Sequence, residues 1–95
     1  MRYDELISKS ELIHQIAEKH GATRIRVFGS VARGEADEKS DIDFLVKLED
    51  NRTLFDLGGL QYDLQESLSI PVDVVTEDGL KEEAREQILG EAKEV

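Results

Sequence analysis

Hydrophobic residues near the N-terminus follow the spacing of an amphipathic helix. In the segment 8–21, apolar positions recur at helical intervals: Leu12, Ile13, Ile16 and Ala17. Ser8 is followed three residues later by Glu11, the spacing of a capping box, and Gly21 is typical of a residue that ends a helix. The pattern therefore predicts a helix that begins near Ser8 and ends near His20.

Three later segments have the short, β-branched and aromatic character of strands: 23–29, 41–48 and 70–79. In the second segment, four apolar residues alternate with other positions and are expected to face the core: Ile42, Phe44, Val46 and Leu48. Pro71 is compatible with the third strand because it stands at the start of that strand.

The segment 53–69 predicts a second long helix. One face of it is apolar: Leu57, Leu60, Leu64 and Leu68. Thr53 and Asp56 have the spacing of an N-terminal cap. Gly58 and Gly59 in the interior should each cost about 1 kcal/mol relative to Ala, which indicates a close approach of other groups to the backbone there.

The last predicted helix covers 79–92, with Asp78 as its expected cap. Including a short helical turn after the first strand, the order is helix, strand, turn, strand, helix, strand, helix. This order predicts an α/β fold in a single domain over residues 1–95, with a small, mostly three-stranded mixed sheet flanked by about four helices.

Carboxylates occupy the polar face of the predicted sheet. Asp41 and Asp43 are two residues apart in one strand, so their side chains point to the same face, opposite the apolar set. Asp73 alternates in the same way with Val72 and Val74. If the second and third strands are neighbours, the three aspartates meet on one side of the sheet, where they repel one another unless a cation joins them. Oxygen ligands suit Mg²⁺, which also binds substrate phosphates, so the pattern indicates a Mg²⁺ site for a nucleotide.

The loop between the first two strands adds groups that favour an anion. Gly29 and Ser30 end the first strand and open a short helical turn, where backbone N–H groups and a hydroxyl can face a phosphate. Arg33 follows one turn later and Gly34 ends the turn, which brings a guanidinium within reach of phosphate oxygens. Ser40, at the end of this loop, is included among the expected nucleotide-binding residues.

Each of these features also has a plain structural interpretation. The Gly-Ser and Arg-Gly steps are compatible with an ordinary loop, and the Asp-x-Asp pair with a solvated strand edge. Asp73 is compatible with an ion pair to Lys or Arg. His14 and His20 lie on the first helix or at its end, where surface or capping roles are more common than metal ligation.

The composition narrows the possible functions. The 95 residues include 12 Lys and Arg against 22 Asp and Glu, a formal charge of -10. Direct nucleic-acid binding is not expected, because neutralising phosphates requires clustered basic residues. The absence of cysteine excludes disulfides and cysteine-based zinc sites and favours a cytoplasmic protein. Neither a membrane segment nor an export signal is expected, since the apolar stretches are only a few residues long.

The motifs are more specific in combination than singly. Ten residues separate Ser30 from Asp41, which gives the pattern Gly-Ser-x10-Asp-x-Asp, with Asp73 on a later strand. On these residues the sequence resembles the minimal nucleotidyltransferase family of the DNA polymerase β-like nucleotidyltransferase superfamily. The resemblance covers roughly residues 5–92, through blocks similar to those of MntA-type antitoxins: VFGSVARGEADEKSDIDFLV, TLFDLGGLQYDL, PVDVVTEDGL and EQILGEA.

This resemblance implies the nucleotidyltransferase fold and transfer of AMP from ATP to an acceptor hydroxyl, with release of pyrophosphate. It implies that Asp41 and Asp43 ligate two Mg²⁺ ions, and that Asp73 ligates the catalytic ion and helps to deprotonate the acceptor. Four residues are then expected to contact the nucleotide: Gly29, Ser30, Arg33 and Ser40. Of these, Gly29 and Ser30 are expected to hold the β- and γ-phosphates.

The resemblance also implies a protein partner. By the resemblance to MntA-type antitoxins, the acceptor is expected to be a tyrosine of a HEPN-domain RNase toxin of the HepT type. We therefore expect a cognate toxin as partner. Both a homo-oligomer and a hetero-oligomer with the toxin stay open. Two other functions stay open. One is a non-catalytic nucleotide-binding module that neutralises its partner by direct binding; the other is transfer to a small molecule such as an aminoglycoside, for which no second substrate domain is visible.

Overall fold

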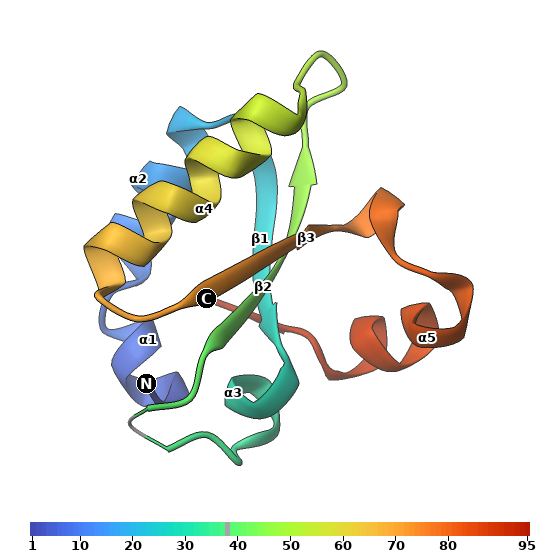
Figure 1. Ribbon diagram of the computed structural model, residues 1–95. Coiled ribbons are helices and arrows are strands. Elements are labelled where there is room, and N and C mark those ends of the chain that lie inside the picture. The colour runs from blue at the N-terminus through green and yellow to red at the C-terminus, as the bar shows by residue number, and fades with distance from the viewer. Residues whose placement is uncertain (38) are drawn as a thin grey trace.

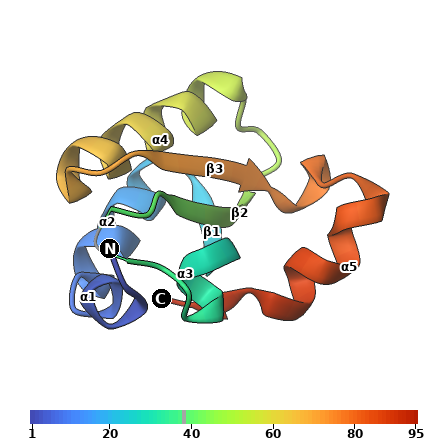
Figure 2. The ribbon, with the colours of Figure 1, turned by 60° about the horizontal axis from the view of Figure 1, so that its bottom comes forward.

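The computed structural model describes residues 1–37 and 39–95, which form a mixed β-sheet packed against helices (Figures 1 and 2). In chain order the elements are α1 (Tyr3–Ile7), α2 (Ser10–Lys19), β1 (Ala22–Phe28), α3 (Gly29–Arg33), β2 (Ile42–Leu48), α4 (Leu54–Leu68), β3 (Val72–Thr76), the 3-10 turn η1 (Glu77–Gly79), α5 (Glu82–Glu91) and β4 (Lys93–Glu94). The expected α/β fold class is therefore confirmed. None of the helices in the described part of the chain is long and apolar enough to span a membrane.

The strands lie in the order β3-β2-β1-β4. β2 and β3 run parallel, whereas β1 is antiparallel to both β2 and β4. A parallel pair needs a long crossover, and here α4 supplies it. The three predicted strands are present and the second and third are neighbours, as the interpretation of the aspartates required.

The hydrophobic core lies between the sheet and the helices α2 and α4, which lie next to each other in Figure 1. The helices contribute Ile13, Ile16, Ala17, Leu60, Leu64 and Leu68. The strands contribute Ile25, Val27, Ile42, Phe44, Val46, Val72 and Val74. The predicted apolar faces are confirmed except at Leu12 of α2, which is exposed. Leu48 and Leu57 pack against this cluster in partly buried positions.

The sheet has one more strand than the sequence predicted. The two residues of β4 pair with β1, with Glu94 opposite Arg26 and Lys93 opposite Val27. The Tyr3 hydroxyl donates to the backbone oxygen of Glu94 at 2.7 Å. Two residues are too few to show a periodic pattern, so only these long-range contacts define the strand.

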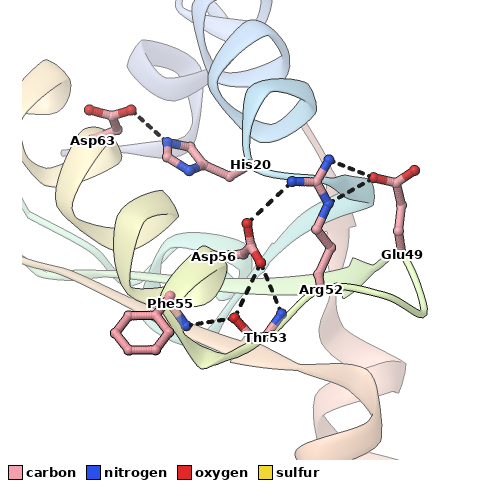
Figure 3. Close-up of polar contacts among 7 residues, drawn as sticks. All are labelled: His20, Glu49, Arg52, Thr53, Phe55, Asp56 and Asp63. Atoms are coloured by element: carbon pink, nitrogen blue, oxygen red, sulfur yellow. Dashed lines mark hydrogen bonds and ion pairs between the residues drawn. The ribbon is translucent and has the colours of Figure 1, made fainter.

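The predicted cap of α4 is confirmed (Figure 3). The Thr53 side chain accepts a hydrogen bond from the backbone N–H of Phe55 at 3.2 Å, and the backbone N–H of Thr53 donates to Asp56 Oδ2 at 2.9 Å. These bonds satisfy N–H groups that have no partner within the helix, and they fix where the crossover helix begins.

Replacing Thr53 with alanine is expected to lower the free energy of unfolding by about 1 kcal/mol, because the first turn of α4 loses its hydroxyl acceptor. Chemical denaturation of the Thr53→Ala variant measures this loss. Thr53→Ser keeps the acceptor and is the matched control. Equal stability of the alanine variant and the wild type would show that the cap contributes nothing.

The expected close approach within α4 occurs at only one of its two glycines. A Cβ atom on Gly59 would lie 2.9 Å from Cε1 of His20, whereas nothing lies within 4 Å of the corresponding position on Gly58. His20 is the C-terminal cap residue of α2, and its Nε2 lies 2.6 Å from Asp63 Oδ2 (Figure 3). The hydrogen bond from His20 lowers the pKa of Asp63. Gly59 therefore leaves room for a polar contact that joins α2 to α4.

Two other predicted caps are wrong. The N-terminal cap of α2 is Lys9, and the Ser8 hydroxyl donates instead to the backbone oxygen of Glu5 at 2.6 Å, because the preceding residues form the unpredicted helix α1. Asp78 does not cap the last helix: it lies in η1, and Lys81 precedes α5. In both places a short additional element, α1 or η1, precedes the longer helix. The longer helix therefore begins later than the sequence pattern predicted.

Candidate active site

The candidate site begins with two aspartates on neighbouring strands. Asp43 of β2 is the register partner of Asp73 of the parallel strand β3. Partners across a ladder point to the same face, and the residues that flank Asp43 in β2, Ile42 and Phe44, are buried in the core on the opposite face. Asp43 is half-buried and Asp73 exposed. The structure therefore brings these two carboxylates to one face of the sheet, away from the core.

Asp41 has a less constrained position than the sequence predicted. β2 begins at Ile42, so Asp41 precedes the strand by one residue and is exposed. It is still close enough for its charge to raise the pKa of Asp43. Asp41 therefore borders the pair formed by Asp43 and Asp73.

The electrostatics of the site concentrate on Asp43. Burial raises the pKa of Asp43, and the charges of Asp73, Asp41 and Glu91 raise it further, whereas Arg33 opposes them. Negative charge is therefore disfavoured at Asp43 unless a cation approaches. This is the electrostatic condition in which a bound cation is stabilising.

Asp41, Asp43 and Asp73 provide the carboxylate oxygens that Mg²⁺ prefers. Within residues 1–37 and 39–95, no group of three or more His, Cys, Asp or Glu side chains is gathered closely enough to hold a metal ion. Asp43 and Asp73 share a face of the sheet, and the charges of Asp73 and Asp41 raise the pKa of Asp43, but the three side chains do not converge on one point.

Gly29 lies directly against Asp43. It follows Phe28, the register partner of Asp43, and it has a positive φ of 72°. A Cβ atom at this position would overlap the Asp43 carboxylate. Both the backbone conformation and the available space therefore require glycine. The predicted turn begins here, because Gly29 is the first residue of α3 and Ser30 the second.

The Gly29 N–H and the Arg33 guanidinium have a common partner in this structure. Glu91, the last residue of α5, accepts from the Gly29 N–H at 3.0 Å through Oε1 and from Arg33 Nη1 at 3.2 Å through Oε2. Arg33 also forms an ion pair with Glu35 at 3.3 Å. We refer to the Gly29 N–H and the Arg33 guanidinium together as the anion cradle.

Ser40 is held within its own loop. Its hydroxyl accepts from the backbone N–H of Asp37 at 2.9 Å and donates to Asp37 Oδ1 at 3.1 Å. Hydrogen bonds from the backbone N–H of Lys39 and from Ser40 lower the pKa of Asp37. Ser40 is therefore bound to Asp37, and its expected nucleotide contact stays a prediction.

The sheet, the paired aspartates and the adjacent glycine turn together correspond to a known family. A family model described as a nucleotidyltransferase domain matches residues 9–95. The chain belongs to the nucleotidyltransferase family. The resemblance inferred from the sequence motifs is thereby confirmed, and the matched region contains the paired aspartates and the anion cradle.

Two relatives are similar to this nucleotidyltransferase over most of both chains. "Putative protein adenylyltransferase MJ0435" of Methanocaldococcus jannaschii is 44% identical over 77 residues, which cover 81% of this chain and 83% of the relative. "Protein adenylyltransferase MntA" of Thermococcus cleftensis is 38% identical over 77 residues, which cover 81% and 78%.

Solved structures agree with the fold of the nucleotidyltransferase. One described as "Structure of putative minimal nucleotidyltransferase" has a TM-score of 0.87 and 46% identity, and the alignment covers 100% of this chain and 97% of the other. Another, "Crystal structure of the toxin-antitoxin with AMP-PNP", has a TM-score of 0.76 and 23% identity, covering 90% and 70%. At that identity the second structure shows likeness in fold alone.

Sequence reasoning missed two charged residues on the site side of the nucleotidyltransferase. Glu91 lies 48 positions after Asp43, in the block EQILGEA, but nothing in that block indicated a contact with Gly29 or Arg33. Arg26 is opposite Leu45 in the β1–β2 ladder, on the same face as Asp43, and is buried. Its Nη2 lies 3.0 Å from Glu77 Oε1, although neither Nε nor Nη2 makes an aligned hydrogen bond within the described residues. The sequence does contain a signal for this buried charge, because Arg26 stands between the apolar residues Ile25 and Val27 in a predicted strand.

Proposed function

We propose that this nucleotidyltransferase transfers AMP from ATP to a tyrosine hydroxyl of a cognate HEPN-type RNase toxin, in a Mg²⁺-dependent reaction that silences the toxin. The observation that supports the proposal most is the pairing of Asp43 with Asp73 across β2 and β3, directly beside Gly29. Carboxylate oxygens, which suit Mg²⁺, therefore lie next to backbone and guanidinium donors, which suit a triphosphate, and this supports the proposal.

Each residue of the site has a proposed role. Asp41 and Asp43 hold two Mg²⁺ ions, and Asp73 holds one of them and accepts the proton of the acceptor hydroxyl. The anion cradle and Ser30 bind the β- and γ-phosphates. The acceptor oxygen forms a bond to the α-phosphorus, the bond from that phosphorus to the β-phosphate oxygen breaks, and pyrophosphate leaves. When bound, the metal ions supply charge stabilisation for the attacking and leaving oxygens.

The proposal of a protein acceptor rests on the relatives and on the charge of the chain. Two relatives are named protein adenylyltransferases, one of them MntA, and a structure with the same fold is described as a toxin–antitoxin pair with AMP-PNP. A charge of -10 complements the basic RNA-binding surface expected of a HEPN toxin and favours rapid association.

The experiment is to mix the protein with ATP, Mg²⁺ and a candidate HEPN-domain protein, and to measure the intact mass of that candidate partner. We expect added mass corresponding to one or more AMP units, located at a tyrosine by peptide fragmentation. Removing metal with EDTA should prevent the addition, and adding back Mg²⁺ should restore it. An unchanged partner mass after hours of incubation with Mg²⁺ and ATP would contradict the proposal.

A second candidate function is neutralisation by binding alone. The helix α4 exposes three large apolar side chains, Leu54 (83% exposed), Phe55 (92%) and Tyr62 (64%), which favour a protein contact. The two functions differ in their dependence on the aspartates. A variant with both Asp41→Asn and Asp43→Asn still protects cells from the toxin if binding suffices, and fails to protect them if AMP transfer is required.

A further inference from the structure

The carboxylate of Glu91 binds both donors of the anion cradle. Its Oε1 accepts from the Gly29 N–H at 3.0 Å and lies 3.3 Å from Arg33 Nη1, and its Oε2 lies 3.2 Å from the same nitrogen. The Glu91 side chain is 16% exposed, so solvent screens these contacts only in part. A carboxylate placed between a backbone N–H and a guanidinium makes the charge-assisted contacts that a phosphate oxygen would make.

The helix that carries Glu91 is loosely attached to the rest of the protein. α5 has no buried residue, and Figures 1 and 2 show it standing to the side, away from α4. Besides the contacts of Glu91, Arg85 Nη1 donates to the backbone oxygen of Glu77 at 2.9 Å. An element with little buried apolar surface opens at a low free energy.

The chain after α5 is better anchored. Glu94 pairs with Arg26 in the sheet, and its Oε1 lies 2.6 Å from Arg24 Nη2. His14 Nε2 lies 2.6 Å from the backbone oxygen of Val95. These contacts hold the chain from β4 onward. The C-terminal end of α5 can therefore move only as far as the region around Glu91, just before β4.

We propose that Glu91 is an internal competitor for the nucleotide triphosphate: its carboxylate occupies the anion cradle, and bound triphosphate displaces it and loosens α5. The proposal rests on the function proposed above, because it takes the cradle to be the triphosphate site. Glu91 then sets the affinity for the nucleotide and couples nucleotide binding to the position of α5, although it takes no part in the transfer step itself.

A purely structural role for Glu91 makes different predictions. If Glu91 only braces α5 against α3, removing its charge weakens the brace and leaves nucleotide affinity unchanged or reduced. If it competes with phosphate, removing its charge frees both donors and strengthens nucleotide binding. The variant Glu91→Gln keeps the size of the side chain and removes the charge. Glu86→Gln is the matched control, because it removes the same charge from an exposed position of the same helix.

The first experiment is isothermal titration of ATP and, separately, of inorganic triphosphate, with Mg²⁺, into the wild type and both variants. We expect Glu91→Gln to bind each ligand roughly fivefold to tenfold more tightly, because a competing charge-assisted contact is lost. Glu86→Gln should remain within about twofold of the wild type, since an exposed charge has only a screened effect on a distant anion.

The second experiment follows the opening of α5 directly. Hydrogen exchange of the amides of α5 in the wild type should become faster on addition of ATP and Mg²⁺, because the displaced Glu91 no longer holds the helix. Glu91→Gln should show this faster exchange without nucleotide. Unchanged or slower exchange in the wild type would show that α5 does not respond to the ligand.

The outcomes separate this proposal from the proposed function. If the wild type binds ATP but Glu91→Gln binds it equally or less tightly, the competitor role is overturned and the proposed function stands. If Glu86→Gln gains as much affinity as Glu91→Gln, the effect is general repulsion and the competitor role is again overturned. If neither the wild type nor Glu91→Gln binds ATP or triphosphate, both proposals are overturned.

Discussion

Replacing Asp43 with asparagine is expected to abolish AMP transfer and at the same time to make the protein more stable at neutral pH. The rate of AMP transfer should fall roughly a thousandfold or more, because the substitution removes a proposed metal ligand. This ligand lies directly against Gly29. Intact-mass measurement of the partner gives the loss of transfer, and urea denaturation gives the change in stability.

The gain in stability follows from the electrostatics of Asp43. Burial and the charges of Asp73 and Asp41 raise its pKa, so the ionised form is disfavoured in the folded state. Because Asp43 is only half-buried and solvent screens part of the repulsion, we expect a gain in the free energy of unfolding of roughly 0.5–1 kcal/mol.

Because the pKa of Asp43 is raised, the difference in stability between Asp43→Asn and the wild type depends on pH. The pKa of Asp43 in the folded protein is raised above its ordinary value of 3.8, so its contribution to the free energy of unfolding is most favourable below pH 3.8, where Asp43 is protonated in both states. That advantage is lost as the pH rises through the folded pKa. The stability of Asp43→Asn relative to the wild type should therefore be greatest at pH 7 and disappear near about pH 3.

Asp50→Asn is the matched control, because Asp50 is an exposed aspartate in the turn after β2. It should leave both transfer and the pH dependence of stability close to those of the wild type. If Asp43→Asn still transferred AMP, the metal assignment would be wrong. A less stable Asp43→Asn at pH 7 would show that a partner stabilises the carboxylate, contrary to the direction of its pKa.

Replacing Gly29 with alanine is expected to weaken ATP binding by at least roughly tenfold and to lower the free energy of unfolding by about 1–3 kcal/mol. Gly29 has a φ of 72°, and its missing Cβ would overlap the Asp43 carboxylate. The added methyl group must displace either Asp43 or the end of β1. Either movement alters the anion cradle and the paired aspartates together.

Gly34→Ala separates the two causes of this effect. Gly34 also has a positive φ, of 75°, but nothing lies within 4 Å of its Cβ position. It should therefore show only the backbone cost, about 1–2 kcal/mol, with ATP affinity close to that of the wild type. Calorimetric titration and chemical denaturation of both variants measure the difference. Equal loss of ATP affinity in both variants would mean that contact with Asp43 is not the cause.

The sequence by itself determined which side chains face the core and which face the site. Alternation in β2 separates Asp43 from Ile42 and Phe44, and the same rule applies to Asp73 in β3, because neighbouring side chains in a strand point to opposite faces. The cap formed by Thr53 and Asp56 was equally predictable, since its partners lie within one helical turn. These features depend on contacts between residues close in the chain.

Only the tertiary structure decided which of these local features meet. The pairing of Asp43 with Asp73 depends on β2 and β3 being parallel neighbours, a condition that the sequence pattern left open. The contact of Glu91 with Gly29 spans 62 residues, and β4 consists of two residues without a pattern of their own. The order and register of strands are set by the whole core, so contacts that depend on them leave no local signal in the sequence.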